Sequence, residues 1–273
     1  MSEVRSTFEH VTRFGTRAFC TLGLIFLLVP IIVVIPLSFN EERFFSYPMP
    51  GVSLRWYAGL LTSEAWRNAL ANSLIVAAST TVAAVAIGGV AALGLQRLKG
   101  RSKAALTAVL ISPMMIPGVV TALALYLSFS PTGISGTYFG IVLAHVLLGI
   151  PFVVITMTAA LMGFNANLMR AAQSLGASQW TCIRRILLPI MLPAVISSAL
   201  FVFVTSFDEF IVTLFLASPE QRTLPLQMWT GVHDDVTPAI FAAATLFILV
   251  SFLMLICVEA LRRHGRYLSG LDK

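Results

Sequence analysis

The chain has little charge. Asp, Glu, Lys and Arg make up 11% of its 273 residues, whereas about 25% is usual in a soluble domain. Hydrophobic residues make up 58%, which is typical of a polytopic membrane protein. The net charge of +6 therefore does not indicate a nucleic-acid-binding protein, because membrane proteins concentrate Lys and Arg on their cytoplasmic side.

Several signatures of chemistry are also missing. The cysteines Cys20, Cys182 and Cys257 are an odd number without metal-ligand spacing, so neither a disulfide framework nor a zinc site is indicated. No Gly-x-x-x-x-Gly-Lys-Ser/Thr loop is present to bind ATP. No His-Glu-x-x-His or Gly-x-Ser-x-Gly motif supports a membrane protease or esterase. We expect no enzyme, no metal and no cofactor in this chain, and an energy source in another subunit.

What the sequence does contain is a series of long uncharged runs, each sufficient for a span of about 20 residues. They predict an all-α fold, with residues 1–273 forming a single transmembrane domain of six helices. The first run is too long for a secretory signal and lacks a small-residue cleavage site, so it is expected to be an uncleaved anchor. The expected spans lie at about residues 18–40, 68–96, 104–130, 137–162, 190–217 and 236–258.

The distribution of positive charge supports this topology. With six spans, Arg43, Arg55, Arg67 and Arg222 fall on the outer side, and the other fourteen of the 18 Lys and Arg fall inside. The positions of the charges were not used to place the spans, so the agreement is independent evidence. Both termini are then expected in the cytoplasm.

Two features within the spans indicate a packed bundle. Ala84, Gly88 and Ala92 repeat every four residues, which predicts a groove of small residues for close helix packing. His145 lies in the fourth span, and a hydrogen bond to a neighbouring helix is a more common role for such a residue than transport.

Prolines and a turn divide the uncharged stretch between residues 104 and 169. The turn-rich segment from Pro131 to Gly136 separates the third span from the fourth. Pro113 and Pro117 lie near the middle of the third span. They free backbone carbonyl groups, which is tolerated only against protein or a water-filled cavity.

The only long polar interruption on the basic side of the chain extends from Gly163 to Pro189. Asn165 or Asn167 can cap a short helix there, and Gly176 is expected to end it in the left-handed conformation. The apolar positions of this helix recur at helical spacing: Leu168, Ala171, Ala172 and Leu175.

A second short helix is expected to follow, capped by Ser178 and ended by Pro189. Both helices are shorter than the about 12–15 residues that an isolated helix needs in water. They would be stable when docked into the groove of another protein; an interfacial loop lying on the bilayer is the alternative.

The spacing in this segment resembles the coupling loop of the permeases of ATP-binding-cassette importers of type I. The family pattern is Glu-Ala-Ala, three residues, Gly, nine residues, Ile, one residue, Leu-Pro. Arg170 replaces the Glu, which puts in doubt any salt bridge of that Glu. The resemblance implies a cytoplasmic helix-turn-helix loop between spans four and five that docks on an ATPase subunit. The residues it assigns to the loop contact are Arg170, Ala171, Ala172, Leu175, Gly176, Ala177, Ile186 and Pro189.

Asp208 and Glu209 lie within the expected fifth span. An acidic side chain at the centre of a span costs ~2.5–3.5 kcal/mol on insertion scales, so it is expected to face a partner. The partner could be a transported cation or an Arg of a paired subunit. Adjacent residues of a helix point about 100° apart, so the two acids need not face the same group. Thr205 and Phe207 are the other candidates for the substrate path.

A hydroxyl-bearing stripe favours Glu209 as the residue that lines the path. This stripe comprises Ser198, Thr205, Ser206, Glu209 and Thr213.

The segment Ser206-Phe-Asp-Glu-Phe210, followed by Thr223-Leu-Pro-Leu226 and residues 238–245, is similar to the spermidine/putrescine branch of these permeases. This similarity covers roughly residues 68–261 and favours Asp208 at least as much as Glu209. It implies half of a path for a cationic amine such as a polyamine. Opines, amino-acid derivatives and 2-aminoethylphosphonate are alternative solutes.

The same resemblance implies a multi-pass protein of the bacterial inner membrane. Its expected partners are a second homologous permease, two copies of a cytoplasmic ATPase that binds ATP and Mg, a periplasmic binding protein and membrane lipid, with no nucleic acid. A stand-alone secondary transporter is the competing class. It would not need a coupling loop, and paired broken helices in the two halves of the chain are not evident.

Overall fold

The computed structural model describes residues 2–43, 49–234 and 237–268. Within these ranges the chain is built of helices, and the only extended pairing is an isolated bridge between Asn40 and Val52. This confirms the expected all-α fold. The chain divides into two compact units, one of residues 1–63 with 230–248 and the other of residues 64–229 with 249–273. Residue 236, where the sixth span was expected to begin, lies outside the described residues.

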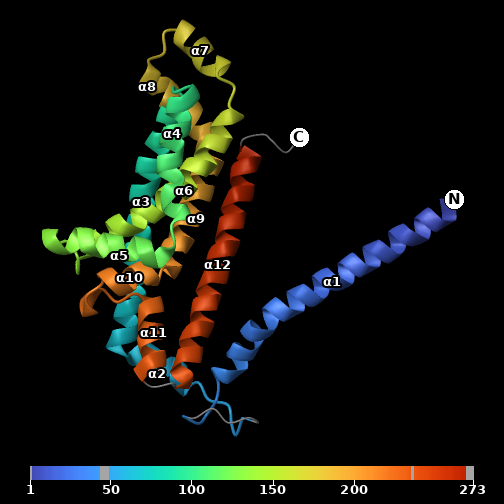
Figure 1. The fold of residues 1–273 in the computed structure, drawn as a ribbon, viewed down its shortest axis with the longest axis vertical. Coiled ribbons are helices and arrows are strands. Elements are labelled where there is room, and N and C mark those ends of the chain that lie inside the picture. Colours follow the sequence, from blue (N-terminus) through green and yellow to red (C-terminus); the bar gives the residue numbers. More distant parts are fainter. Residues whose placement is uncertain (1, 44–48, 235–236, 269–273) are drawn as a thin grey trace. The chain divides into compact units, whose positions relative to one another are not determined.

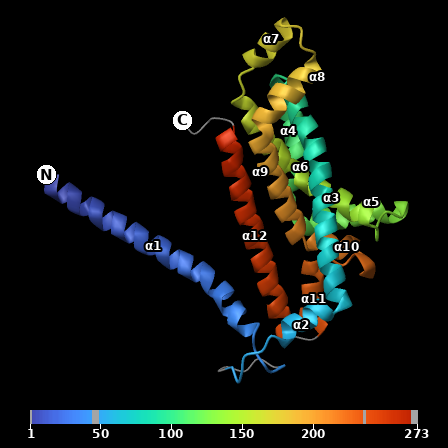
Figure 2. The same cartoon turned by 180° about the vertical axis from the view of Figure 1, so that it is seen from behind.

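Three long helices form the core of the larger unit. These helices, α3 (Glu64–Leu95), α6 (Tyr138–Met162) and α9 (Leu188–Asp208), pack against one another, and they lie side by side in both views (Figures 1 and 2). Gly88 of α3 lies at their closest approach, since a Cβ atom added there would be 2.7 Å from the Cβ of Val153 on α6. Ala84 and Ala92 are fully buried. The predicted small-residue groove is therefore confirmed.

The third span, expected at residues 104–130, is sharply bent. Helix α4 (Gly100–Ile111) is followed by the 3₁₀ turn η1 (Ser112–Met115) and by α5 (Gly118–Phe129), with a bend of 103° between the two parts. Ile116 and Pro117 are extended at the bend, with ψ of 134° and 133°. The cause is Pro117, because its ring disfavours a helical residue before it and it has no N–H for the helical ladder.

The fifth span differs from the prediction at its beginning. Pro189 does not end the second short helix. Instead α8 (Gln179–Cys182) continues through a π-helical turn, η3 (Ile183–Leu187), into α9. The N–H of Leu188 donates to the carbonyl of Ile183, five residues back. A proline here cannot donate to the carbonyl four residues before it, and a π turn shifts the bonding by one residue. The helix is thus continuous from Gln179 to Asp208.

The fifth span also ends early. Helix α9 stops at Asp208, Glu209 is extended with φ −69° and ψ 117°, and a short helix, α10 (Ile211–Leu216), follows. Helix α10 packs against α5 and α6. The expected single span 190–217 is therefore two helices with a break.

The lengths and compositions of the long helices agree with a membrane protein. In the smaller unit, α2 (Arg55–Thr62) is a short helix before the second span. Its Trp56 bonds to the carbonyl of Asn40 at 2.7 Å, and its Tyr57 bonds to the hydroxyl of Ser38 at 2.6 Å. Within the described ranges, five helices are long and apolar enough to cross a membrane, and the bent α4–α5 pair gives a sixth crossing if it is one span. These five are Arg13–Leu37, Glu64–Leu95, Tyr138–Met162, Gln179–Asp208 and Pro238–Ile256.

The other elements are α1 (Ser2–Leu37), η2 (Ser130–Thr132), α7 (Asn167–Ser174), η4 (Pro219–Gln221), α11 (Leu224–Asp234) and α12 (Pro238–Leu268).

The packing of α3 on α6 gives a testable prediction. Gly88→Val places a side chain against Val153, and overpacking of this kind costs about 1–3 kcal/mol. We expect a lower thermal unfolding midpoint for the purified protein in detergent. Gly89→Val is the matched control, because a Cβ atom at Gly89 has no neighbour within 4 Å. Equal midpoints for the two variants would contradict this account of the interface.

Candidate functional site

The segment 163–189, which we call the coupling segment, folds largely as expected at its first helix. The side chain of Asn165 accepts the N–H of Asn167 at 3.0 Å, where α7 begins. Gly176 has φ +85°. Its N–H donates to the carbonyl of Gln173 at 2.9 Å, and that of Ala177 to the carbonyl of Ala172 at 3.1 Å. These two bonds form the cap that satisfies the last carbonyls of a helix ending in a left-handed residue, so the predicted stop at Gly176 is confirmed.

The second helix begins as predicted. The hydroxyl of Ser178 accepts the N–H of Thr181 at 3.2 Å and caps α8. Because Pro189 does not end the helix, α8 is continuous with α9 as far as Asp208.

The surface of the coupling segment carries large apolar side chains. Leu175 is 89% exposed and Trp180 is 70% exposed. Exposed apolar groups in a polar segment suit a contact with another protein or with the bilayer surface. Sequence reasoning missed Trp180, although a lone Trp in a polar stretch between two spans is a signal for such a contact. Of the other assigned residues, Arg170, Ala171 and Pro189 are exposed, and Ala172, Ala177 and Ile186 are half-buried.

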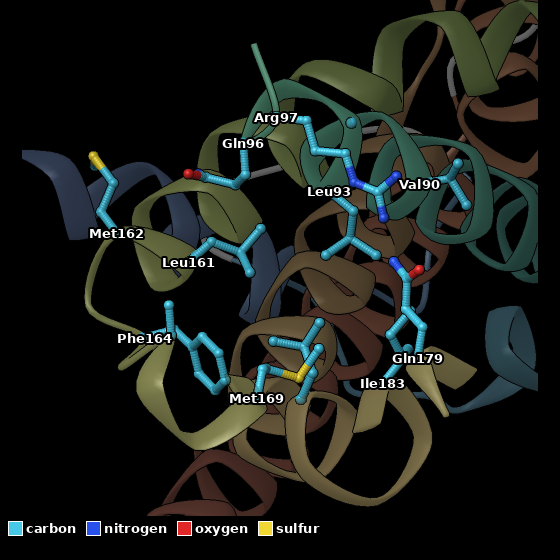
Figure 3. A pocket seen from close by; sticks show the side chains of 13 residues that line it. Val90, Leu93, Gln96, Arg97, Leu161, Met162, Phe164, Met169, Gln179 and Ile183 are labelled. Atoms are coloured by element: carbon cyan, nitrogen blue, oxygen red, sulfur yellow. The ribbon is translucent and has the colours of Figure 1, made fainter. Parts of the chain in front are cut away.

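A cavity of about 860 Å³ lies where the coupling segment joins the helix bundle. It is bounded by the ends of α3 and α6 and by the coupling segment (Figure 3). Arg97 and Gln179 supply polar groups to its wall, and Phe164 and Met169 supply apolar ones. Phe164, Met169 and Ile183 of this lining also pack against the core cluster of the bundle.

The structure separates the two acids of the predicted substrate path. Asp208 is the last residue of α9 and its side chain is exposed. Glu209 is half-buried, and its Oε1 accepts the N–H of Val212 at 2.9 Å. In the part of the chain that the structure describes, the Asp208 carboxylate has no such bond. The predicted stripe along one continuous helix is wrong, because the helix ends between its members.

His145 lies beside this break and is 2% exposed. Its Nδ1 is 2.8 Å from the hydroxyl of Ser206 on α9, and its Nε2 is 3.2 Å from the hydroxyl of Thr213 on α10. The expected hydrogen bond to a neighbouring helix is confirmed, and His145 makes two such bonds, one to α9 and one to α10.

The other two path candidates have different surroundings. Thr205 is half-buried and lines a narrow crevice together with His145 and Glu209. Phe207 is 2% exposed, and its ring stacks on Phe203 with centroids 6.0 Å apart. The structure therefore brings Thr205 to the acidic pair and places Phe207 in the interior of the chain.

The loop after α10 is held by the start of α3, which sequence reasoning did not predict. The side-chain amide of Asn72 donates to the carbonyls of Glu220 and Arg222, each at 2.9 Å. The hydroxyl of Tyr138 donates to the Asn72 carbonyl oxygen at 2.7 Å. Asn72 is 5% exposed, so the geometry of this loop is fixed by the bundle.

The same loop presents a carboxylate. The backbone N–H of Glu220, the hydroxyl of Ser218 and the nearby Arg222 hold the pKa of the Glu220 carboxyl below its usual range. Glu220 is therefore ionised at neutral pH. Among the described residues, no group of three or more His, Cys, Asp or Glu side chains could hold a metal ion.

Comparison with solved structures places this fold among transporters. A bacterial ABC transporter involved in the import of alginate matches 94% of this chain and 98% of its own, with a TM-score of 0.73 and 17% identity. The MetNI methionine ABC transporter matches 75% of this chain and 99% of its own, with a TM-score of 0.57 and 15% identity.

Sequence comparison gives nearer relatives. The spermidine/putrescine transport system permease protein PotC of Haemophilus influenzae is 33% identical over 94% of this chain and 100% of its own length. The putrescine transport system permease protein PotI of Escherichia coli K12 is 31% identical over 83% of each chain. The profile of the family described as binding-protein-dependent transport system inner membrane component matches residues 84–267. Because that match covers most of the chain, the protein belongs to this family of inner membrane transport components.

Proposed function

We propose that this chain is the permease subunit of an ATP-driven importer and forms half of the path for a cationic amine such as a polyamine. The observation that carries the choice of cargo is the exposed carboxylate of Asp208 at the end of an apolar helix. The relatives PotC and PotI are permeases of spermidine/putrescine and putrescine transport systems, which supports the same class of cargo.

Electrostatics at the end of α9 favour a cation. The last carbonyls of a helix are not bonded within it and carry the negative end of the helix dipole. Asp208 adds a full negative charge at the same end. An ammonium group that leaves water loses about 5 kcal/mol of hydration free energy per charge after relaxation. A carboxylate and a ring of carbonyls together offset part of that loss.

Glu209 has a different role in this proposal. Its carboxylate accepts the Val212 N–H at the start of α10. There it supplies the hydrogen bond that a first-turn N–H lacks within the helix, and its negative charge is stabilised by the positive end of the helix dipole. We therefore assign the cation contact to Asp208 and the capping of α10 to Glu209.

The coupling segment is the proposed contact with the energy source. Two copies of a cytoplasmic ATPase would bind ATP and Mg, and the exposed Leu175 and Trp180 would dock on one of them. A second homologous permease, a periplasmic binding protein and lipid complete the assembly, with both termini in the cytoplasm. A solved alginate ABC transporter in complex with its periplasmic protein has the same fold, with a TM-score of 0.70.

Uptake by the complex reconstituted in vesicles, measured over a panel of amines, tests this function. Polyamines should be taken up with ATP and not without it. If an opine, an amino-acid derivative or 2-aminoethylphosphonate is taken up instead, the proposed role as a permease stands and the proposed cargo is wrong. Uptake without any ATPase would indicate a secondary transporter instead.

The acidic pair generates a prediction. Asp208→Asn should reduce amine uptake by about tenfold or more, because a hydrogen bond to a charged group contributes about 1.5–3 kcal/mol. Glu209→Gln is the control, since the Gln amide oxygen can still accept the Val212 N–H. It should retain most of the uptake.

Assembly and basal ATP hydrolysis must be measured for both variants. Normal uptake by Asp208→Asn would show that this carboxylate is not the partner of the cation. Failure of Asp208→Asn to assemble with the second permease would instead indicate an ion pair between subunits.

Gly176 gives a second prediction. Gly176→Val should abolish ATP-dependent uptake while the chain still inserts, because a left-handed residue with a side chain costs about 1–2 kcal/mol and the cap of α7 would be lost. Gly163→Val lies in the same segment at φ −84° and should be milder. Full uptake by a well-expressed Gly176→Val complex would refute the role of this cap.

Arg170 is expected to tolerate change. The residue is exposed, and its guanidinium donates a long hydrogen bond of 3.4 Å to the side-chain oxygen of Asn167. Arg170→Glu should therefore leave the ratio of ATP hydrolysed to amine transported unchanged in vesicles. A higher ratio would show that docking depends on a basic group at this position.

A further inference from the structure

A continuous set of hydrogen bonds crosses the break between α9 and α10, and His145 of α6 is its centre. On one side His145 bonds to Ser206, two residues before the end of α9. On the other side it bonds to Thr213, in the first turn of α10. The Thr213 hydroxyl donates in turn to the carbonyl of Glu209, at the break itself, over 3.3 Å.

The direction of these bonds follows from the donors available. The single proton of the Thr213 hydroxyl is used on the Glu209 carbonyl, so this hydroxyl accepts from His145. Nε2 of His145 must therefore carry a proton. The Nδ1 atom of a neutral imidazole is then an acceptor, and it accepts the hydroxyl proton of Ser206. Each group has a distinct donor or acceptor role, which fixes one orientation of the ring.

Such a tie is needed because a helix break in an apolar region exposes backbone groups that water does not reach. The carbonyl of Glu209 receives its partner from Thr213, and Thr213 is held by His145. The Glu209 side chain caps α10 from the same place. If the tie were removed, the chain could satisfy these groups by extending α9 through residues 209–213.

We propose that His145 is a positioning residue that holds α9 and α10 apart at Glu209 and so sets the direction of the Asp208 carboxylate. At 2% exposure His145 does not itself reach a passing solute. It acts through Ser206, which is anchored two residues from Asp208 on the same helix. The contact between Asp208 and an amine rests on the proposed function. The role of His145 in fixing the position of Asp208 does not depend on that function.

A labelling experiment tests the position of residue 208 without any transport. Asp208→Cys is made in a chain whose three cysteines are replaced by alanine, and the assembled complex in vesicles is treated with a cationic methanethiosulfonate. Adding His145→Phe keeps a ring in the space but removes both ring nitrogens. We expect the labelling rate at position 208 to change by about fivefold or more, given that a side-chain hydrogen bond between membrane helices contributes a factor of about three.

Two further variants make the result specific. Ser206→Ala removes one of the two ties and covers the case in which His145→Phe does not assemble; it should change the rate by about threefold. Thr158→Val is the matched control, because Thr158 lies on the same helix, α6, and its buried hydroxyl has no hydrogen-bond partner. It should leave the rate unchanged.

An unchanged rate in both His145→Phe and Ser206→Ala would overturn the proposal, and so would an equal change in Thr158→Val. Amine uptake supplies the second readout in the native sequence. His145→Phe should raise the amine concentration needed for half-maximal uptake, and should add no further loss when combined with Asp208→Asn. Independent losses would show a general structural role instead. If the complex transports no amine at all, the proposed function fails while the labelling result still decides the role of His145.

Discussion

Every backbone carbonyl and N–H group in the apolar part of this chain needs a partner, and the rest of the structure depends on how that requirement is met. A long helix without proline, such as α3, meets it internally. Three places that do not are the bend at Pro117, the start of α9 at Pro189 and the break at Glu209. The chain bends by 103° at Pro117 and forms a π-helical turn before Pro189. At Glu209, side-chain hydrogen bonds supply the missing partner. These departures from straight helices produce the shape of the proposed path and its link to the coupling segment.

The two acids show how such a break assigns roles to side chains. On a continuous helix, Asp208 and Glu209 would be similar carboxylates on neighbouring faces. Because α9 ends between them, one carboxylate lies at the negative end of a helix and the other at the positive end of the next. Glu209 is satisfied there by the Val212 N–H. Asp208 ends α9 with an exposed carboxylate, and this position is the basis for proposing that it binds the cargo.

In the proposed function, a single helix links the ATPase contact to the substrate path. The π turn at Ile183–Leu187 lets α8 continue into α9 past Pro189. One end of this helix carries the exposed Trp180 and the other carries Asp208. The cavity beside Arg97 leaves room at the first end. In the proposed function, this continuous helix transmits a displacement from a docked subunit to the path.

The sequence by itself determined the all-helical membrane fold, the small-residue groove around Gly88 and the caps at Gly176 and Ser178. These features depend on local spacing, on uncharged length and on the conformational freedom of single residues, which neighbouring sequence reveals. Only the tertiary structure decided that Pro117 makes a sharp bend, that Pro189 continues a helix and that α9 ends at Asp208. It also decided that Asn72 holds the loop after α10 and that His145 joins both sides of the break. The physical reason is that a broken helix is stable in an apolar region only if groups distant in sequence, such as Ser206 and Thr213 around His145, supply the missing hydrogen bonds.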